Sequence, residues 1–298
     1  MKACTKPLVF TGAASALVTP FSHGEIDYDA LGRLIDWQIA GGIDALVIAG
    51  TTGECATLSD EEHRAVLRFS AERCAGRVPL IAGSGSNDTE YALSLSRYAC
   101  EVGFDAVLLV TPYYNKATPR GLIRSFRTIA DAIDRPILLY DAPGRTGVRI
   151  PLAVYEELAQ HERIAGVKDA SGDVAAGAAL LSSCGDSLCV YSGNDELTVP
   201  LMSLGARGVI SVISNLMPRR MHELCAAALA GNFTAASETA LRLNPLMRAL
   251  FVEPNPIPVK AACAMMGLCS AETRLPLCEP EPEHEELLRC VLREAGLL

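Results

Sequence analysis

The chain has 298 residues, of which half are hydrophobic and one fifth are charged, and its formal net charge is −9. This composition is typical of a globular protein with enough apolar material for a large core, and it excludes extended disorder. Lysine and arginine are scattered among acidic residues, so the basic stripe of a nucleic-acid-binding protein is missing.

Neither a membrane segment nor a metal site is expected. No apolar run approaches the ~20 residues that a membrane-spanning helix needs, and the N-terminus lacks the long apolar stretch of a signal peptide. The 11 cysteines are scattered through apolar patterns without a Cys-x-x-Cys pair, and the five histidines stand far apart. This usage is typical of free thiols in a reducing compartment. We therefore expect a cytoplasmic protein that needs no metal and no other cofactor.

Eight short apolar runs recur at fairly even spacing. They are residues 15–18, 45–48, 79–82, 106–110, 136–140, 164–167, 188–191 and 208–211. Each run is continuously apolar instead of alternating, which is the pattern of strands buried on both faces of a parallel sheet.

Helical patterns lie between the runs, for example over residues 29–40, 91–102 and 122–133. Ser59 to Glu62 matches a capping box that opens a further helix. Eight strand–helix units without a flexible linker predict an α/β fold, the (β/α)8 or TIM barrel. An open, doubly wound sheet is the alternative, because periodicity does not distinguish open from closed parallel sheets.

After residue 217 the pattern is helical to the end of the chain. The predicted helices are residues 219–230, 234–251, 258–266 and 283–295. Only part of this region can form the eighth helix of the barrel. We therefore place the barrel in residues 1–225 and a C-terminal helical extension in residues 226–298, packed on the barrel as a single structural unit.

Lys168 stands at the end of the sixth apolar run. In a TIM barrel, residues at the carboxyl ends of the strands face one common opening, where catalysis takes place. Burial disfavours the charged form of an amine, and a neutral amine attacks a keto carbonyl to give a Schiff base. For Lys168 considered alone, the plainer interpretation is favoured: a lysine paired with Asp169, or one that reaches solvent.

Other polar residues follow neighbouring runs and belong to the same opening. Tyr140 ends the fifth run beside Lys168, where a phenol can transfer protons. Thr51 and Thr52 follow the second run, and their hydroxyls can bind a carboxylate or relay a proton. Arg145 lies in a glycine-containing segment, where a guanidinium suits a substrate carboxylate. Each residue has an ordinary structural alternative, but together they predict Schiff-base catalysis on a small keto acid.

Five segments together resemble the dihydrodipicolinate synthase family, within the N-acetylneuraminate lyase superfamily of class I aldolase-type barrels. They are Gly50-Thr51-Thr52-Gly53-Glu54, Thr111-Pro112-Tyr113-Tyr114-Asn115-Lys116, Tyr140-Asp141-Ala142-Pro143-Gly144-Arg145-Thr146-Gly147, Gly166-Val167-Lys168-Asp169-Ala170-Ser171-Gly172-Asp173 and Glu253-Pro254-Asn255-Pro256-Ile257-Pro258-Val259-Lys260. The resemblance covers nearly the whole chain. It implies condensation of pyruvate with L-aspartate 4-semialdehyde to 4-hydroxy-tetrahydrodipicolinate, a step toward diaminopimelate and lysine.

The resemblance also implies roles by position. Lys168 would form the Schiff base with pyruvate, and Tyr140 would be the general acid and base. Thr51 would link the proton relay, and Thr52 would contact the pyruvate carboxylate. Arg145 would bind the carboxylate of the semialdehyde. The backbone positions that match the lining of the pyruvate pocket are Gly193 and Ile210.

Arg145 also discriminates within the superfamily. Sialic acid lyases resemble this chain in the lysine and the tyrosine, but they differ where Arg145-Thr146-Gly147 stands and tend to carry Ser-Thr where Thr51-Thr52 stands. The synthase reaction is therefore our first hypothesis, and an N-acetylneuraminate lyase or another class I keto-acid aldolase is the second. A catalytically silent barrel that binds keto acids is a third, against which the joint presence of lysine, tyrosine and arginine argues.

Two positions depart from the relatives that lysine inhibits, which commonly carry a glutamate where Tyr91 stands and a histidine where Asp60 stands. A tyrosine lacks the carboxylate that the ammonium group of an inhibitor requires, so we expect weak or absent feedback by lysine. Three positions still match the inhibitor site of the family: His63, Asn87 and Tyr113.

The adjacent aromatic residues Tyr113 and Tyr114 are typical of an interface, because aromatic residues are enriched where proteins associate, and packing in the core is the plainer alternative. The resemblance implies that Tyr114 enters the site of a neighbouring subunit as a member of its proton relay. It further implies a homotetramer built as a dimer of dimers.

Overall fold

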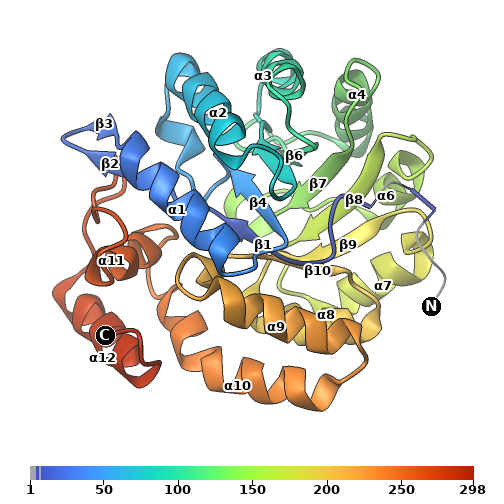
Figure 1. The fold of residues 1–298 in the computed structure, drawn as a ribbon. Helices are drawn as coiled ribbons and strands as arrows, with labels where there is room; N and C mark the ends of the chain where they lie inside the picture. The colour runs from blue at the N-terminus through green and yellow to red at the C-terminus, as the bar shows by residue number, and fades with distance from the viewer. Residues whose placement is uncertain (1–4, 7) are drawn as a thin grey trace.

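The computed structural model describes residues 5–6 and 8–298, and its centre is a closed barrel of eight parallel strands (Figure 1). The strands are β1 (Gly12–Ala16), β4 (Ala45–Ile48), β5 (Leu80–Gly83), β6 (Ala106–Val110), β7 (Ile137–Asp141), β8 (Ile164–Asp169), β9 (Cys189–Ser192) and β10 (Gly208–Ser211). Strand β1 pairs with both β4 and β10, which closes the barrel. The predicted TIM barrel is confirmed, and the open sheet is wrong.

Helices that follow the strands form the outer layer (Figure 1). They are α1 (Tyr28–Ala40), α2 (Asp60–Cys74), α3 (Thr89–Glu101), α4 (Pro119–Ala130), α6 (Leu152–Leu158), α7 (Val174–Cys184), α8 (Thr198–Leu204) and α9 (Pro218–Leu229). The predicted capping box opens α2: the Ser59 side chain accepts from the Glu62 N–H, and the Glu62 carboxylate accepts from the Ser59 N–H.

Short elements complete the barrel. They are the hairpin of β2 (Phe21–Ser22) and β3 (Glu25–Ile26), the one-turn helix α5 (Pro143–Thr146), and the 3₁₀ turns η1 (Cys55–Thr57), η2 (Asp195–Leu197) and η3 (Ile213–Asn215).

Two apolar clusters explain why the strand sequences are apolar at every position. Side chains that point into the barrel, such as Val47, Leu138 and Tyr191, form the inner cluster. Side chains that point outward, such as Leu46 and Leu139, pack with the helices in the outer cluster. Successive residues of a strand point to opposite faces, so both faces must be apolar to be buried.

Strand ends differ from the sequence prediction in two respects. Strand β1 lies at Gly12–Ala16 instead of residues 15–18, because small side chains occupy the strand while Leu17 and Val18 follow it into the outer cluster. Strands β7 and β8 continue to Asp141 and Asp169, beyond the apolar runs. The polar residues after these runs are thus held by strand hydrogen bonds and not by loops.

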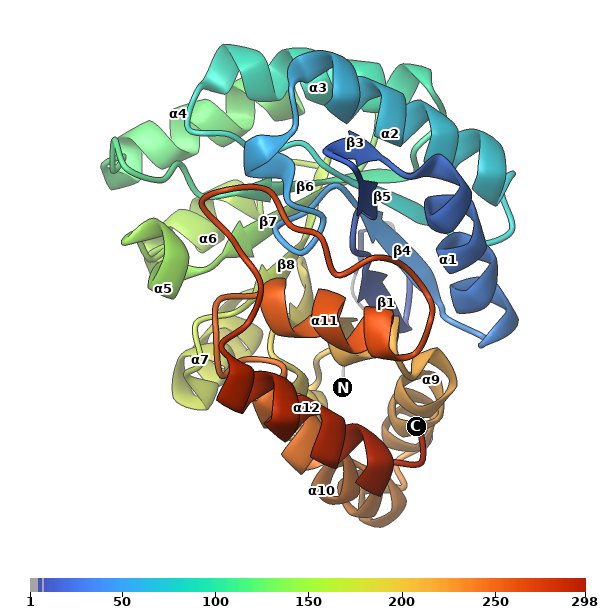
Figure 2. The same cartoon turned by 90° about the vertical axis from the view of Figure 1, so that its left-hand side faces the viewer.

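The C-terminal region adds α10 (Phe233–Ala249), α11 (Ile257–Met265) and α12 (Pro282–Glu294). Figure 2 shows α11 and the segment after it lying across one end of the barrel. Helix α9 spans residue 225, so the predicted boundary between barrel and extension falls within a helix. In the described part of the chain, none of the helices has the length and apolar character needed to cross a bilayer.

Asp141 is buried at the end of β7, one residue after Tyr140. Its Oδ2 accepts hydrogen bonds from the Tyr155 hydroxyl at 3.1 Å and from the Ile150 N–H at 3.3 Å. Burial raises the pKa of Asp141 to about 6, and the nearby charge of Asp169 acts in the same direction. The ionised carboxylate therefore destabilises the folded chain at neutral pH.

We predict that Asp141→Asn raises the free energy of unfolding near neutral pH and has little effect near pH 4. The folded pKa of about 6 exceeds the unfolded value, so the native protein holds the proton more tightly and loses stability as the pH rises between the two values. A shift of this size corresponds to roughly 3 kcal/mol at most. Urea unfolding at both pH values measures the effect, with exposed Asp134→Asn as the control. A pH dependence that is identical in Asp141→Asn and the wild type contradicts the prediction.

Candidate active site

Lys168 and Tyr140 are direct neighbours across the paired strands β8 and β7. They are 6% and 7% exposed, and Lys168 Nζ lies 4.3 Å from the centroid of the Tyr140 ring. At this distance the electron-rich face of the ring attracts a cation. The side-by-side arrangement expected from the sequence is present, while the chemical roles of the two residues stay predictions.

Lys168 forms no ion pair with any carboxylate of residues 5–6 and 8–298. Successive side chains of a strand point to opposite faces, so the adjacent Asp169 points to the other face of β8. Its Oδ1 accepts a hydrogen bond of 2.9 Å from the Ser171 N–H. The plainer interpretation of Lys168, pairing with Asp169, is therefore not what the structure contains. A buried amine without a carboxylate partner is available to react with a carbonyl compound.

A cavity of about 160 Å³ opens beside Lys168. It is lined by Thr52, Tyr140, Ala142, Gly144, Arg145, Lys168, Ala170, Gly193, Asn194, Val212, Phe251 and Asn255. These residues come from the carboxyl ends of several strands, from α5 and from the C-terminal extension. The amine, a phenol, a hydroxyl and a guanidinium thus line one small space.

Asn255 connects two of these groups, and sequence reasoning assigned it no role. Its side-chain Nδ2 donates a hydrogen bond of 2.9 Å to the hydroxyl of Thr52, and its backbone carbonyl accepts one of 3.1 Å from Arg145 Nη2. Asn255 is buried and stands just before α11. In the sequence, Asn255 stands out only as a member of the family-like segment of residues 253–260, and that segment does not reveal its hydrogen-bond partners.

A second cavity of about 280 Å³ adjoins the first. Thr51 and Tyr113 line it, and it shares Arg145 and Asn255 with the Lys168 cavity. The two neighbouring threonines are therefore divided between the cavities, with Thr52 on the side of the lysine. Arg145, on the one-turn helix α5, reaches both spaces.

A buried ion pair holds the segment of residues 50–54, which contains both threonines, against α11. Lys260 Nζ lies 2.7 Å from Glu54 Oε1, and both side chains are almost completely buried. Glu54 Oε2 also accepts a hydrogen bond of 3.1 Å from the Arg274 N–H. Burial lowers the pKa of Lys260, and the charge of Glu54 opposes this effect. Because an unpaired buried charge costs free energy, Lys260 and Glu54 hold each other in position.

The remaining predicted substrate residues lie in different environments. Gly193 lines the Lys168 cavity, and a Cβ there would lie 2.6 Å from the Ala170 Cβ, so only glycine fits. Ile210 is fully buried in the inner cluster, two residues before Val212 at the cavity wall. Tyr114 is 91% exposed with φ at +69°, and it lines neither cavity.

The three positions that match the inhibitor site lie in different local environments. His63 is buried with Nε2 3.0 Å from the Gly83 carbonyl oxygen, and burial lowers its pKa to about 4, so it is neutral at pH 7. The Asn87 carbonyl accepts a hydrogen bond of 2.9 Å from Asn115 Nδ2. Tyr113 lies at the second cavity.

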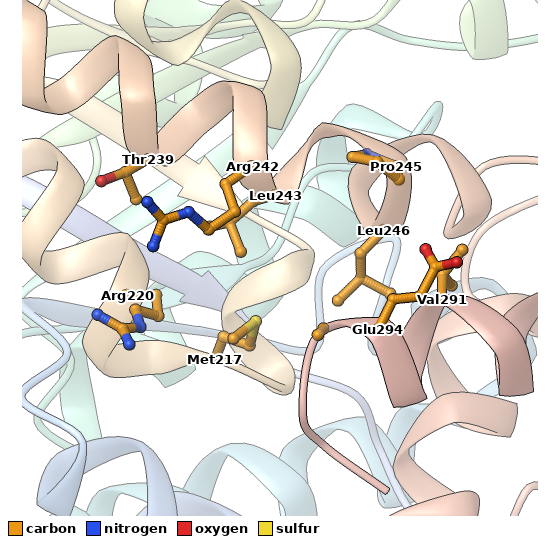
Figure 3. A pocket seen from close by; sticks show the side chains of 10 residues that line it. Met217, Arg220, Thr239, Arg242, Leu243, Pro245, Leu246, Val291 and Glu294 are labelled. Atoms are coloured by element: carbon orange, nitrogen blue, oxygen red, sulfur yellow. The ribbon is translucent and has the colours of Figure 1, made fainter.

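Another cavity, of about 170 Å³, lies between α9, α10 and α12 (Figure 3). Arg220 and Arg242 lie at one side of it and Glu294 at the other. None of the predicted catalytic residues lines it. Nor does any group of three or more His, Cys, Asp or Glu side chains that could hold a metal ion occur among the described residues.

Comparisons with known proteins agree with one another. Residues 9–295 match the model of the "Dihydrodipicolinate synthetase family". A 4-hydroxy-tetrahydrodipicolinate synthase from Acetivibrio thermocellus is 47% identical over 97% of this chain and 99% of its own length.

Solved structures match equally well. Dihydrodipicolinate synthase from Aquifex aeolicus has a TM-score of 0.95 and 47% identity, over 97% of this chain and 99% of that one. The chloride-inhibited enzyme from Acinetobacter baumannii, complexed with pyruvate, has a TM-score of 0.95 and 43% identity over the same shares. Because residues 9–295 match the family model and a relative that is 47% identical is matched over nearly its whole length, the chain belongs to the dihydrodipicolinate synthetase family.

Proposed function

We propose that this chain condenses pyruvate with L-aspartate 4-semialdehyde, the reaction of the 4-hydroxy-tetrahydrodipicolinate synthases that it is similar to. The observation that carries the proposal is Lys168, a buried amine without a carboxylate partner, beside Tyr140 in a cavity of about 160 Å³. The related enzyme from Acinetobacter baumannii was solved with pyruvate, the substrate that this lysine would hold.

Lys168 acts as the nucleophile of the proposed reaction. Its neutral amine attacks the keto carbon of pyruvate, and loss of water leaves an iminium on Nζ. Tyr140 gives and takes the protons of these steps, and Thr51 passes protons onward. Removal of a proton from the pyruvate methyl group gives an enamine, whose carbon attacks the aldehyde of the second substrate.

Two polar groups select the substrates. Thr52 and Gly193 line the Lys168 cavity, and in the proposal the Thr52 hydroxyl contacts the pyruvate carboxylate. The backbone of Ile210, which lies two residues before Val212 at the cavity wall, is assigned to the pyruvate pocket by the resemblance alone. Arg145 lines both cavities, so its guanidinium can bind the carboxylate of the semialdehyde while the aldehyde reaches the enamine. Asn255 holds Thr52 and Arg145 in their relative positions.

Borohydride reduction in the presence of pyruvate tests the proposed nucleophile. We predict a pyruvate adduct on Lys168 and its loss in Lys168→Ala. Lys260 is a control within the same chain, because it is equally buried but paired with Glu54 and so stays unmodified. An adduct at another lysine, or none, refutes the mechanism. A coupled assay with aspartate semialdehyde and with N-acetylneuraminate then separates the synthase from a lyase.

We further infer that the active unit is a dimer within a homotetramer. Tyr114 is 91% exposed and lines neither of the two cavities near Lys168, and its φ of +69° is unusual for a tyrosine. An exposed aromatic side chain of this kind suits insertion into a neighbouring subunit, where its hydroxyl would join the proton relay.

Mixed dimers test the shared site. We predict that Tyr114→Phe lowers activity without unfolding the protein, because only the phenolic hydroxyl is lost. Mixing Tyr114→Phe chains with Lys168→Ala chains should partly restore activity, since one site of the mixed dimer then has both residues. Sedimentation verifies the dimers, and mixed dimers without recovered activity argue against a shared site.

The barrel and the extension act as one unit in this proposal. Phe251 and Asn255, from the extension 226–298, line the Lys168 cavity that the barrel residues 1–225 build.

We also propose a cytoplasmic location, which suits the ten free cysteines of the described residues.

We predict that lysine inhibits this enzyme weakly or not at all. Tyr91 offers a hydroxyl instead of a carboxylate, and the nearby carboxylate of Asp60 is paired with Arg64 at 2.9 Å. The ammonium group of a lysine inhibitor therefore has no unpaired carboxylate to bind beside Tyr91. Titration of activity with lysine measures the effect, and Tyr91→Glu, which adds the carboxylate, should increase it. Strong inhibition of the wild type at low lysine concentration overturns this expectation.

A further inference from the structure

A further cavity, of about 220 Å³, lies on the outside of the barrel, where the ends of β7 and β8 meet the helices α6 and α7. Apolar side chains of residues 150–152 and of α7 form most of its wall. Its polar lining consists of Asp141, Arg149, Tyr155 and Asp169. Neither Lys168 nor Tyr140 lines this cavity, so it is separate from the proposed active site.

Two buried carboxylates stand side by side in its lining. The register of β7 and β8 pairs Asp141 with Asp169, and the two residues are 2% and 6% exposed. Burial raises the pKa of Asp141 to about 6, and the charge of Asp169 acts in the same direction. Two acids in such a place favour the approach of a cation, because its charge offsets both their desolvation and their mutual repulsion.

Each carboxylate keeps one oxygen without a hydrogen-bond partner. Asp141 Oδ2 accepts from the Tyr155 hydroxyl and from the Ile150 N–H, whereas its Oδ1 is buried and has no partner in the described part of the chain. Asp169 Oδ1 accepts from the Ser171 N–H, and among the described residues its Oδ2 accepts no hydrogen bond. An unsatisfied acceptor costs free energy, so a donor that reaches these two oxygens would stabilise the folded chain.

The chain itself does not neutralise this pair of acids. Arg149 is the one basic residue of the cavity lining, and its partly exposed guanidinium lies 3.4 Å from Asp173 instead of pairing with either buried carboxylate. Space beside Asp169 is kept by Gly177, where a Cβ would lie 3.2 Å from Asp169 Oδ2 and 2.5 Å from the side chain of Leu201. The carboxylate thus has room on the side of α7.

We propose that this cavity binds a small primary alkylammonium ion, with the ammonium group on Asp141 and Asp169 and the alkyl chain against the apolar wall. A primary ammonium group has three N–H donors. The cavity lining offers three acceptors, namely Asp141 Oδ1, Asp169 Oδ2 and the hydroxyl oxygen of Tyr155, whose proton is already donated to Asp141.

A metal ion suits the same place less well. Mg²⁺ and Ca²⁺ require about six or more oxygen ligands, and no group of three or more His, Cys, Asp or Glu side chains that could hold a metal occurs among the described residues. An apolar wall also favours an alkyl chain over the water molecules that a hydrated ion keeps. The proposed ligand is therefore an organic cation.

Calorimetric titration of the full-length chain with n-butylammonium tests the proposal at pH 8, where Asp141 is ionised. We expect saturable binding of one ion per chain, and at saturation a rise of about 2–4 °C in the midpoint of thermal unfolding. Two probes separate charge from shape: n-butanol has the alkyl chain without the charge, and K⁺ has the charge without the alkyl chain. An equal effect of either probe, or no binding of n-butylammonium, overturns the proposal.

Variants locate the binding site. Asp141→Asn and Asp169→Asn should each abolish binding, and exposed Asp134→Asn should retain it as the matched control. Because Asp141→Asn is expected to stabilise the fold, its loss of binding would not reflect unfolding. Ala176→Leu fills the cavity without changing a charge and should also abolish binding. Binding that persists in both Asn variants overturns the proposal, and neither result depends on whether Lys168 binds pyruvate.

Discussion

The parallel pairing of β7 with β8 is the constraint from which the site follows. The register places Tyr140 opposite Lys168 and Asp141 opposite Asp169. Because side chains alternate along a strand, the first pair shares the inner face of the barrel and the second pair shares the outer face. A slip of one residue in either strand would exchange amine and carboxylate between the faces. Closure of the barrel by β1 leaves no free edge at which such a slip could start.

Two buried lysines show how environment assigns a role to a residue type. Lys260 has a carboxylate at 2.7 Å, so its charge is compensated and it serves as a structural tie. Lys168 has the face of an aromatic ring, a small cavity and no carboxylate partner in the described chain. Only the environment of Lys168 leaves the Nζ atom available to react with a substrate carbonyl.

The C-terminal extension contributes to the site directly. Asn255 donates to Thr52 and accepts from Arg145, while Lys260 holds Glu54, two residues after Thr52. Two strand-end groups and the one-turn helix α5 are thereby fixed by a segment that lies more than a hundred residues away in the chain. The extension thus sets the distance between the proposed contact for the pyruvate carboxylate and the proposed contact for the semialdehyde.

The sequence by itself determined the barrel, seven of its strands to within a residue or two, and the family. It also determined the opening of the barrel at which the predicted site residues gather, namely Lys168, Tyr140, Thr51, Thr52 and Arg145. It did so because continuous apolar runs and strand-end polar residues are local patterns, readable without partners. Only the tertiary structure decided that Lys168 is unpaired while Lys260 is paired, that Asn255 joins Thr52 to Arg145, and that the two threonines face different cavities. These facts depend on contacts between residues far apart in the chain, and no local pattern encodes such a contact.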